Sequence, residues 1–171
     1  MNVFTCFSVS LVVLVCAGCS QPVSADAKSE MPSGTIKLSS QSDGGGYVCG
    51  IPTTSPPAEP GTRYKVSFDS DNHQCDNDKY NYIQLDNVPS ATRLGFDSDY
   101  CEQDNREEWV FSLHTTKHPT TTILMYIPTI LASTVGTIIA PGVVLDRKVV
   151  GERGDGIGEL SCVEVLRSAL P

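Results

Sequence analysis

The chain has 171 residues, of which 40% are hydrophobic and 19% are charged, and its formal net charge is −8 at pH 7. This length allows one ordinary domain or two very small ones, and the composition excludes a wholly disordered, collagen-like or coiled-coil chain. The negative charge argues against nucleic acid as a partner, because phosphate binding needs a basic face.

The first 18 residues have the features of an export signal. They contain no Asp, Glu, Lys or Arg, and residues 9–17 form an apolar run of signal-peptide length, too short to predict a membrane-spanning helix. The run ends in Cys16-Ala17-Gly18-Cys19, which resembles a bacterial lipobox with Cys16 where that motif usually has Leu. The resemblance implies that Cys19 is lipidated, becomes the first mature residue and anchors the protein by its acyl chains. The alternative is a plain secretory signal that is cleaved nearby.

Ser20, the residue after the lipidation cysteine, bears on localisation. In Gram-negative lipoproteins an Asp at this position usually means retention in the inner membrane. The resemblance to these lipoproteins therefore implies an outer-membrane lipoprotein that faces the periplasm, attached to the membrane through its lipid anchor only.

Residues 19–46 predict a flexible tether. They are rich in Ser, Ala, Pro, Gly and Asp, and only residues 35–38 have the composition of a strand. Three consecutive glycines at 44–46 mark the expected boundary of the tether. We expect a single domain over residues 47–171.

Short apolar runs recur through this expected domain without the 3.6-residue period of a helix. Gly, Pro, Asn and Asp separate the runs, which are rich in β-branched and aromatic residues. This pattern predicts an all-β domain, a sandwich or barrel, that is large enough to bury one core. The expected strands are residues 64–68, 80–85, 92–96, 109–113, 121–127, 134–139, 143–150 and 162–166.

An internal repeat with a period of 28 residues lies in the first half of the domain. The sequence Phe-Asp-Ser-Asp occurs at 68–71 and again at 96–99, and residues 68–85 and 96–113 share seven identities in 18 aligned positions. Lys65 likewise corresponds to Arg93. Each unit predicts a strand, an acidic loop and a second strand. Because a hairpin-sized unit cannot bury its own face, we expect the two units to pack together.

The two acidic loops and their flanks hold the whole net charge. Residues 69–108 contain eleven acidic and three basic residues, whereas the rest of the chain contains nine of each. A dense acidic patch on a rigid β scaffold attracts a basic partner over long range, so we expect it to bind a basic protein. The residues of this expected acidic surface are Asp69, Asp71, Asp76, Asp78, Asp97, Asp99, Glu102 and Asp104.

Four of the seven cysteines remain when Cys6, Cys16 and Cys19 are set aside, and four cysteines in an exported chain predict two disulfides. Three connectivities are open. We favour Cys75–Cys101, because neighbouring repeats would bring the two acidic loops together. We pair Cys49 with Cys162 partly by elimination, since this bridge would tie the ends of the domain. These four cysteines have no CxxC or CxxH spacing, so a zinc site is not expected.

The acidic loops also contain candidate calcium ligands. Residues 77–82 (Asn-Asp-Lys-Tyr-Asn-Tyr) partly match the calcium motif of βγ-crystallin Greek-key domains, and residues 87–92 are similar to that family's connector. The resemblance covers about residues 64–116. It implies that the all-β domain is a Greek-key sandwich or barrel. It also implies a calcium-stabilised structural envelope protein, which is the alternative to a protein-binding role. The metal ligands would be Asn77, Asp78, Asn81, Asp97 and Asp99.

Signatures of catalysis are missing from the sequence. It lacks a G-x-S-x-G elbow, an H-E-x-x-H helix and a Gly-rich phosphate loop, and its remaining cysteines are expected to be oxidised. His114 and His118 would share one strand face, which is more typical of an ordinary surface than of a metal pair. We therefore expect a non-enzymatic binding lipoprotein without a cofactor. Its layout is similar to that of periplasmic immunity proteins and hydrolase inhibitors.

Overall fold

The computed structural model describes residues 34–53, 61, 63–69, 75–101, 108–151 and 155–167, all within the unit Met31–Pro171. The predicted signal peptide (1–18), the lipidation site Cys19 and the predicted tether up to residue 33 lie outside the described residues. The described residues form ten strands and one short helix. These are β1 (Thr35–Ser39), β2 (Val48–Pro52), β3 (Arg63–Ser67), β4 (Tyr82–Asp86), β5 (Thr92–Asp97), β6 (Trp109–Thr115), β7 (Met125–Tyr126), α1 (Ile127–Ala132), β8 (Ile138–Ala140), β9 (Val143–Val150) and β10 (Cys162–Arg167).

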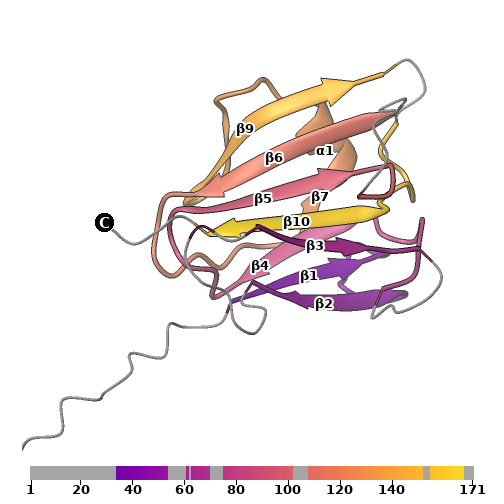
Figure 1. Ribbon diagram of the computed structural model, residues 1–171, viewed down its shortest axis with the longest axis horizontal. Coiled ribbons are helices and arrows are strands. Elements are labelled where there is room, and N and C mark those ends of the chain that lie inside the picture. The colour runs from indigo at the N-terminus through magenta and orange to yellow at the C-terminus, as the bar shows by residue number, and fades with distance from the viewer. Residues whose placement is uncertain are drawn as a thin grey trace, which may run out of the picture. The chain divides into compact units, whose positions relative to one another are not determined.

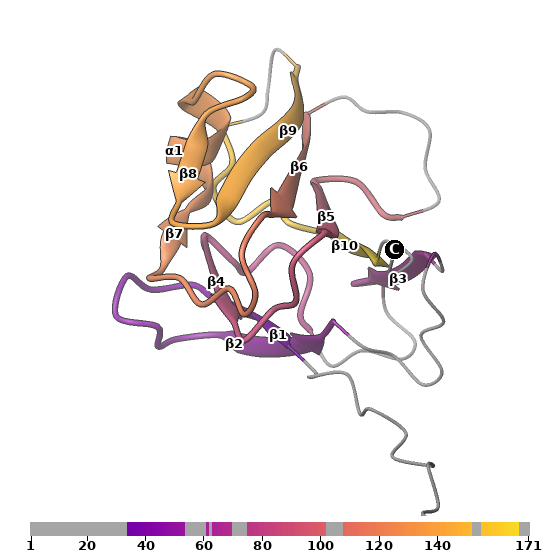
Figure 2. The same cartoon turned by 90° about the vertical axis from the view of Figure 1, so that its left-hand side faces the viewer.

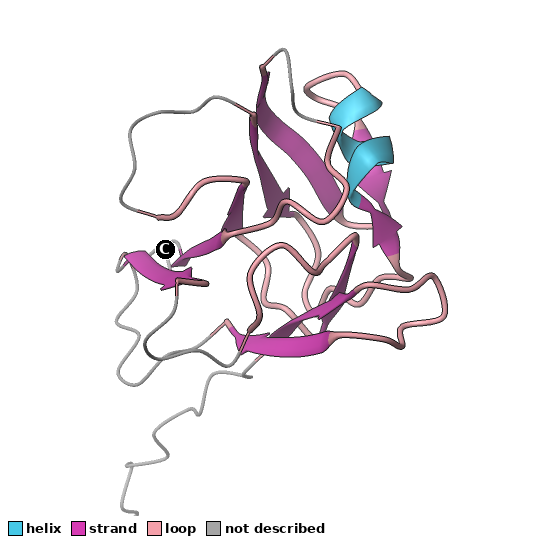
Figure 3. Cartoon of the chain, turned by 90° about the vertical axis from the view of Figure 1, so that its right-hand side faces the viewer, coloured by secondary structure: helices cyan, strands magenta, loops and turns pink. Residues whose placement is uncertain are grey.

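The strands form two antiparallel sheets. Sheet A has the order β2-β1-β4-β7, and sheet B has the order β3-β10-β5-β6-β9-β8. Figure 1 shows the strands of sheet B stacked from β9 down to β3, with β4, β1 and β2 below them. Helix α1 lies beside β7 and β8 at one side of the sheets (Figure 2). In the described part of the chain it is the one helical segment, as Figure 3 shows by colour.

Side chains from both sheets meet in one core. Along β6 every second residue is buried and those between are half-buried, as expected of a strand with one face against a core. Sheet B contributes three large rings, of which Phe111 stacks between Phe96 and Trp109 with ring centroids 5.0 and 5.5 Å apart. Sheet A completes the same cluster with aliphatic side chains, namely Ile36, Leu38, Ile51, Ile83 and Leu85.

Helix α1 adds a further part of the core. Its buried residues are Ile127, Ile130 and Leu131, and its last carbonyl groups have no partners within the helix. Lys148 of β9 supplies a donor, because its Nζ donates to the carbonyl oxygens of Leu131 and Ser133 at 2.6 and 2.7 Å. No helix in the described part of the chain is both long enough and apolar enough to cross a membrane.

The all-β fold with two disulfides is confirmed, and most strands lie where the sequence predicts them. Strand β9 covers the expected residues 143–150. The strand expected over residues 121–127 is wrong: only Met125–Tyr126 is a strand, and helix α1 starts at Ile127. Pro128 lies in the first turn of this helix, where a proline is accommodated because its missing N–H would have no helical partner. Greek-key connectivity and the βγ-crystallin resemblance stay predictions.

The domain begins before the boundary expected at residue 47. Strand β1 pairs with both β2 and β4, so it is an interior strand of sheet A, and its Ile36 and Leu38 are buried. Gly34 precedes it so close to Val88 that a Cβ there would lie 2.5 Å from Val88 Cα. Only glycine allows this approach of two backbones. The tether predicted for residues 19–46 therefore does not extend through residues 34–46.

Candidate functional site

The described parts of both acidic loops lie at one end of the sheets, which we call the acidic end. Strands β1, β3, β5 and β9 end there, and β2, β4, β6 and β10 begin there. We define the acidic end as the described residues of segments 40–47, 68–81, 97–108 and 151–161. Segment 158–161 runs between the ends of β3 and β5 in sheet B, since Ser161 accepts the N–H of Phe68 through its carbonyl and donates its own N–H to the carbonyl of Asp97.

The acidic end gathers more carboxylates than the repeat supplies. Five residues of the predicted acidic surface are described, and they all lie here; Asp71, Glu102 and Asp104 lie outside the described residues. Segments 40–47 and 151–161 also contribute carboxylates, and the repeat does not indicate them because they lie outside it. The described acidic residues of the acidic end are Asp43, Asp69, Asp76, Asp78, Asp97, Asp99, Glu108, Asp155 and Glu159, and its described basic residue is Lys79.

Hydrogen bonds to segment 158–161 fix the first acidic loop. Asp78 has a positive φ of 54°, which an Asp adopts more easily than most residues because its short side chain bonds locally. Its carboxylate accepts from Ser161 Oγ at 3.1 Å and from Asn77 Nδ2 at 2.8 Å. Asn81 accepts the N–H of Gly158 at 2.6 Å and donates its Nδ2 to the carbonyl of Ser40 at 3.2 Å. One asparagine thus joins three segments of the acidic end.

Tyr80 supports the same loop from the core. Its buried ring packs edge-on against Phe68, with centroids 5.9 Å apart, and its hydroxyl accepts the N–H of Asp76 at 2.9 Å. Burial raises the pKa of the Tyr80 phenol; the charge of Asp76 also raises it, and the hydrogen bond from the Asp76 backbone lowers it. The folded protein therefore favours the neutral phenol.

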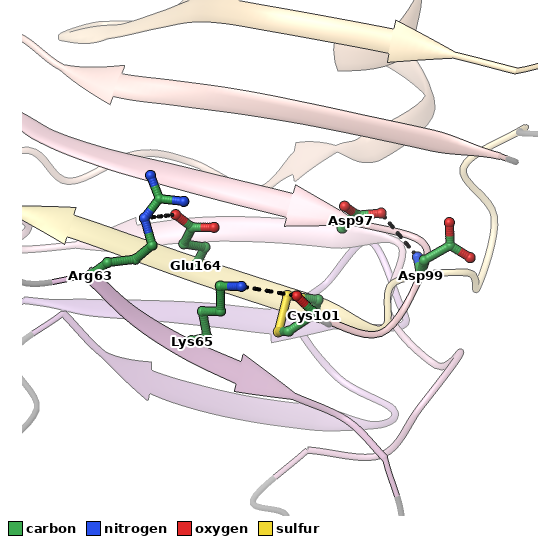
Figure 4. Close-up of a disulfide and its surroundings, with 7 residues drawn as sticks. Arg63, Lys65, Asp97, Asp99, Cys101 and Glu164 are labelled. Atoms are coloured by element: carbon green, nitrogen blue, oxygen red, sulfur yellow. Dashed lines mark hydrogen bonds and ion pairs between the residues drawn. A yellow bond between two sulfur atoms is a disulfide. The ribbon is translucent and has the colours of Figure 1, made fainter. Parts of the chain in front are cut away.

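The second acidic loop turns back on itself and contacts the first. Asp97 Oδ1 accepts the N–H of Asp99 at 3.0 Å, and Ser98 Oγ both donates to the carbonyl and accepts from the N–H of Trp109. Figure 4 shows Asp97 and Asp99 beside Cys101. Between the loops, Asn77 Nδ2 donates to the Tyr100 hydroxyl at 3.4 Å. The described parts of the two acidic loops are therefore in direct contact.

The disulfides join pairs other than those favoured from the sequence. Cys49 of β2 pairs with Cys75 of the first acidic loop, and Cys101 of the second loop pairs with Cys162 of β10, with Cα atoms 5.3 and 5.1 Å apart. The pairings Cys75–Cys101 and Cys49–Cys162 are therefore wrong. Each bridge ties one acidic loop to a strand of the sheets.

The physical reason is that the two repeat units do not have equivalent positions. Residues 96–113 form a hairpin within sheet B, whereas residues 68–85 leave sheet B after β3 and enter sheet A at β4. The first loop therefore passes the β2 side of the molecule, where Cys49 lies. Strand β10 lies between β3 and β5, with Cys162 opposite Asp97, so Cys101 is close to it.

The five residues predicted as calcium ligands have mixed environments. The carboxylate of Asp78 and the amide oxygen of Asn81 accept the hydrogen bonds given above, as does Asp97 Oδ1. Asn77 Oδ1 and Asp99 Oδ2 are buried acceptors without a hydrogen-bond partner among the described residues. The described ranges contain no group of three or more His, Cys, Asp or Glu side chains placed to hold one metal ion.

Comparisons with known proteins add no assignment. No protein-family model matches the chain, and neither a curated protein nor a solved structure gave a match. The acidic end, its disulfides and the charges around it are therefore the features that bear on function.

Proposed function

We propose that this protein is a non-enzymatic lipoprotein of the bacterial envelope that binds a basic protein through its acidic end. The most specific form of the proposal is an immunity or inhibitor protein. The observation that carries it is the gathering of the described acidic residues of four segments at one end of the sheets. By sequence, these four segments contain fourteen acidic and three basic residues, so their summed charge is strongly negative.

Electrostatics and rigidity both favour a binding role for such a surface. Carboxylates held close together repel one another, and an approaching basic partner relieves this repulsion while being attracted over long range. The loops are fixed in advance by Cys49–Cys75, Cys101–Cys162 and the hydrogen bonds of Asn81. A surface that is ordered before binding loses less conformational entropy on binding.

The envelope location rests on the start of the sequence. Residues 1–18 have the composition of an export signal, and Cys16-Ala17-Gly18-Cys19 resembles a lipobox. Acyl chains on Cys19 would hold the domain at a membrane surface, where its partner would arrive by diffusion. The two disulfides suit an oxidising compartment outside the cytoplasm.

The charge reversal Asp76→Lys tests the acidic end. Asp76 is exposed, and its contact with Tyr80 is made through its backbone N–H, so the substitution leaves the fold intact. The protein is immobilised, a partner is captured from the native envelope fraction and identified, and its dissociation constant is then measured as a function of salt. We expect Asp76→Lys to weaken binding by about tenfold or more, because like charges then face each other.

Asp86→Lys is the matched control for this experiment. It makes the same change of charge on β4 of sheet A, away from the acidic end, where Asp86 pairs with Lys37 at 2.7 Å. Its affinity should stay within about twofold of the unmodified protein, since rim charges far from a contact act weakly through screened solvent. Equal losses in both variants, or binding that is insensitive to salt, would contradict the proposal.

A calcium-stabilised structural role is the second candidate, and one observation favours it. Asn77 Oδ1 and Asp99 Oδ2 are buried acceptors without a hydrogen-bond partner in the described ranges, and a cation would satisfy such oxygens. The test is a thermal melt in excess calcium and then in excess chelator. A ligand present at about a hundred times its dissociation constant adds about 2.7 kcal/mol to the free energy of unfolding. For a calcium site we therefore expect a shift of several degrees that magnesium does not reproduce; identical melts would remove this candidate.

A further inference from the structure

A groove on the outer face of sheet B carries charges of the opposite sign to the acidic end. Its volume is about 530 Å³, within the usual range for a small-molecule site. Four basic and three acidic side chains line it, a net positive surface on a chain whose net charge is −8. The basic residues are Arg63, Lys65, Arg93 and Arg147.

The strand register explains why the groove is hollow. One row of paired residues crosses five strands of sheet B in the order Lys65, Glu164, Gly95, Ser112 and Arg147. The two smallest side chains of this row lie at its centre, on β5 and β6. A Cβ at Gly95 would lie 3.2 Å from the Cβ of Glu164, a tight contact, so this position favours glycine. Long charged side chains on both sides thus surround a low floor.

A β-bulge in β9 brings a second charged residue to this face. Arg147 lies opposite Ser112 and Leu145 opposite Leu113, so Asp146 is an extra residue without a partner on β6. Consecutive residues of a regular strand point to opposite faces, but both Asp146 and Arg147 line the groove. Bulges redirect side chains in this way and occur often beside functional sites.

Two carboxylates hold the arginines in position. Glu164 Oε1 lies 2.7 Å from Arg63 Nε, and Asp146 Oδ2 lies 3.1 Å from Arg93 Nε. Because each ion pair is formed through Nε, it does not use the two terminal amino groups of the arginine. Figure 4 shows Arg63 bound to Glu164 in this way, with Lys65 beside it. His114 Nδ1 lies 2.5 Å from Asp146 Oδ1 and restrains Asp146 from the other side.

Arg63 and Arg93, the two arginines in these ion pairs, lie on either side of the same residue of β10. Arg63 and Arg93 both lie opposite Leu166 of β10, so their Cα atoms are two strand spacings apart, about 10 Å. Two guanidinium groups at this separation can donate from both sides to one oxyanion or to two linked ones. Guanidinium groups favour phosphate and sulfate because their paired N–H donors match the spacing of the oxygens.

We propose that this groove binds a small ligand that carries phosphate or sulfate groups, held between Arg63 and Lys65 on one side and Arg93 and Arg147 on the other. The floor at Gly95 and Ser112 leaves room for the ligand to approach the sheet. The groove borders the acidic end at Asp97 and Cys101, but its proposed ligand contacts are the four cations of β3, β5 and β9, so the proposal stands or falls independently of the proposed function.

Titration of the whole protein with inorganic pyrophosphate and with sulfate tests the proposal. We expect saturable binding of pyrophosphate, with amide chemical shift changes concentrated in residues 93–97, 110–114, 146–147 and 162–166. The double variant Arg93→Gln, Arg147→Gln should weaken binding by about tenfold or more, because two of the four cations are lost. The matched control is Lys37→Gln, Lys117→Gln, which removes the same charge outside the groove and should change the affinity by less than about twofold.

A second variant keeps the charges and fills the floor. Ser112→Phe places a ring in the groove while leaving every cation in place, and a thermal melt checks that the variant is folded. Loss of pyrophosphate binding in this variant supports a site above Ser112. The proposal is overturned if neither anion binds saturably, or if the arginine double variant or folded Ser112→Phe binds like the unmodified protein.

Vesicles identify the source of the anionic group. Binding to phosphatidylcholine vesicles that contain phosphatidylglycerol, lost on addition of pyrophosphate, supports the site with a lipid headgroup as its ligand. Pyrophosphate binding without vesicle binding supports the site with a soluble phosphate or sulfate ester as its ligand.

Discussion

Replacing Cys101 and Cys162 with alanine is expected to lower the free energy of unfolding by about 4 kcal/mol. The bridge spans a sequence separation of 61 residues, and in the loop-entropy account a longer closed loop restricts the unfolded chain more strongly. The shorter bridge Cys49–Cys75 spans 26 residues, so its removal should cost about 3.5 kcal/mol. For a domain of this size the larger loss corresponds to a decrease in melting temperature of roughly 10–15 °C.

Urea unfolding of the two double variants, followed by circular dichroism, measures both losses. Digestion without reduction provides the check on connectivity: peptides holding Cys101 and Cys162 should remain linked, as should those holding Cys49 and Cys75. A linked Cys75–Cys101 peptide would contradict the structure. The two variants should also differ at the acidic end, since each releases a different acidic loop while the other bridge remains.

The disulfide pairing shows what the local sequence could not reveal. The repeat correctly marks equivalent core positions, because Phe68 and Phe96 are both buried, as are Leu85 and Leu113. Its two units nevertheless enter different sheets after their acidic loops. The second strand of the second unit, β6, pairs with β5 and β9, whereas the second strand of the first unit, β4, pairs with β1 and β7. Pairing of β4 with β1 is a long-range contact. Identical short motifs predict the local turn and the buried residue, but they do not predict which sheet the second strand of each unit will join.

The residues of β1 show a related limit. The sequence marks residues 35–38 as the strand-forming part of an otherwise polar segment, and this local interpretation holds. Composition assigns the surrounding residues to a tether, yet Ile36 and Leu38 are buried between β2 and β4. A five-residue strand can be central in a sheet when both neighbours pair with it, and short apolar runs do not reveal how many neighbours they will have.

The acidic residues could be predicted from the sequence to form a cluster, but the charged groove on sheet B could not, because it depends on how the strands pair. Carboxylates cluster along the sequence in residues 69–108, so their charge is visible before folding. The cations of the groove come from β3, β5 and β9, separated by many residues, and only the register of sheet B brings them together. The correspondence between Lys65 and Arg93 in the repeat is the one sequence signal that pointed to this face.

Replacing Trp109 with alanine is expected to destabilise the domain by about 4–5 kcal/mol, because it removes a large buried ring from the core. The indole is 1% exposed and stacks on Phe111. Its Nε1–H donates to Glu159 Oε2 at 2.7 Å, and the same oxygen accepts the N–H of Gly156 at 3.1 Å. The substitution therefore leaves a cavity and also takes one of two donors from a carboxylate that holds the turn before β10.

Two further variants separate these contributions. Trp109→Phe keeps most of the ring stacking and loses the indole donor, so we expect a smaller loss of about 2 kcal/mol. Glu159→Gln keeps an acceptor oxygen for the indole and should cost about 1 kcal/mol. Urea unfolding by circular dichroism compares all three, and the fluorescence of Trp109, the single tryptophan of the chain, follows the unmodified protein independently. If Trp109→Ala and Trp109→Phe were equally stable, stacking against Phe111 would not contribute, and the core would depend on the aliphatic contacts between the two sheets.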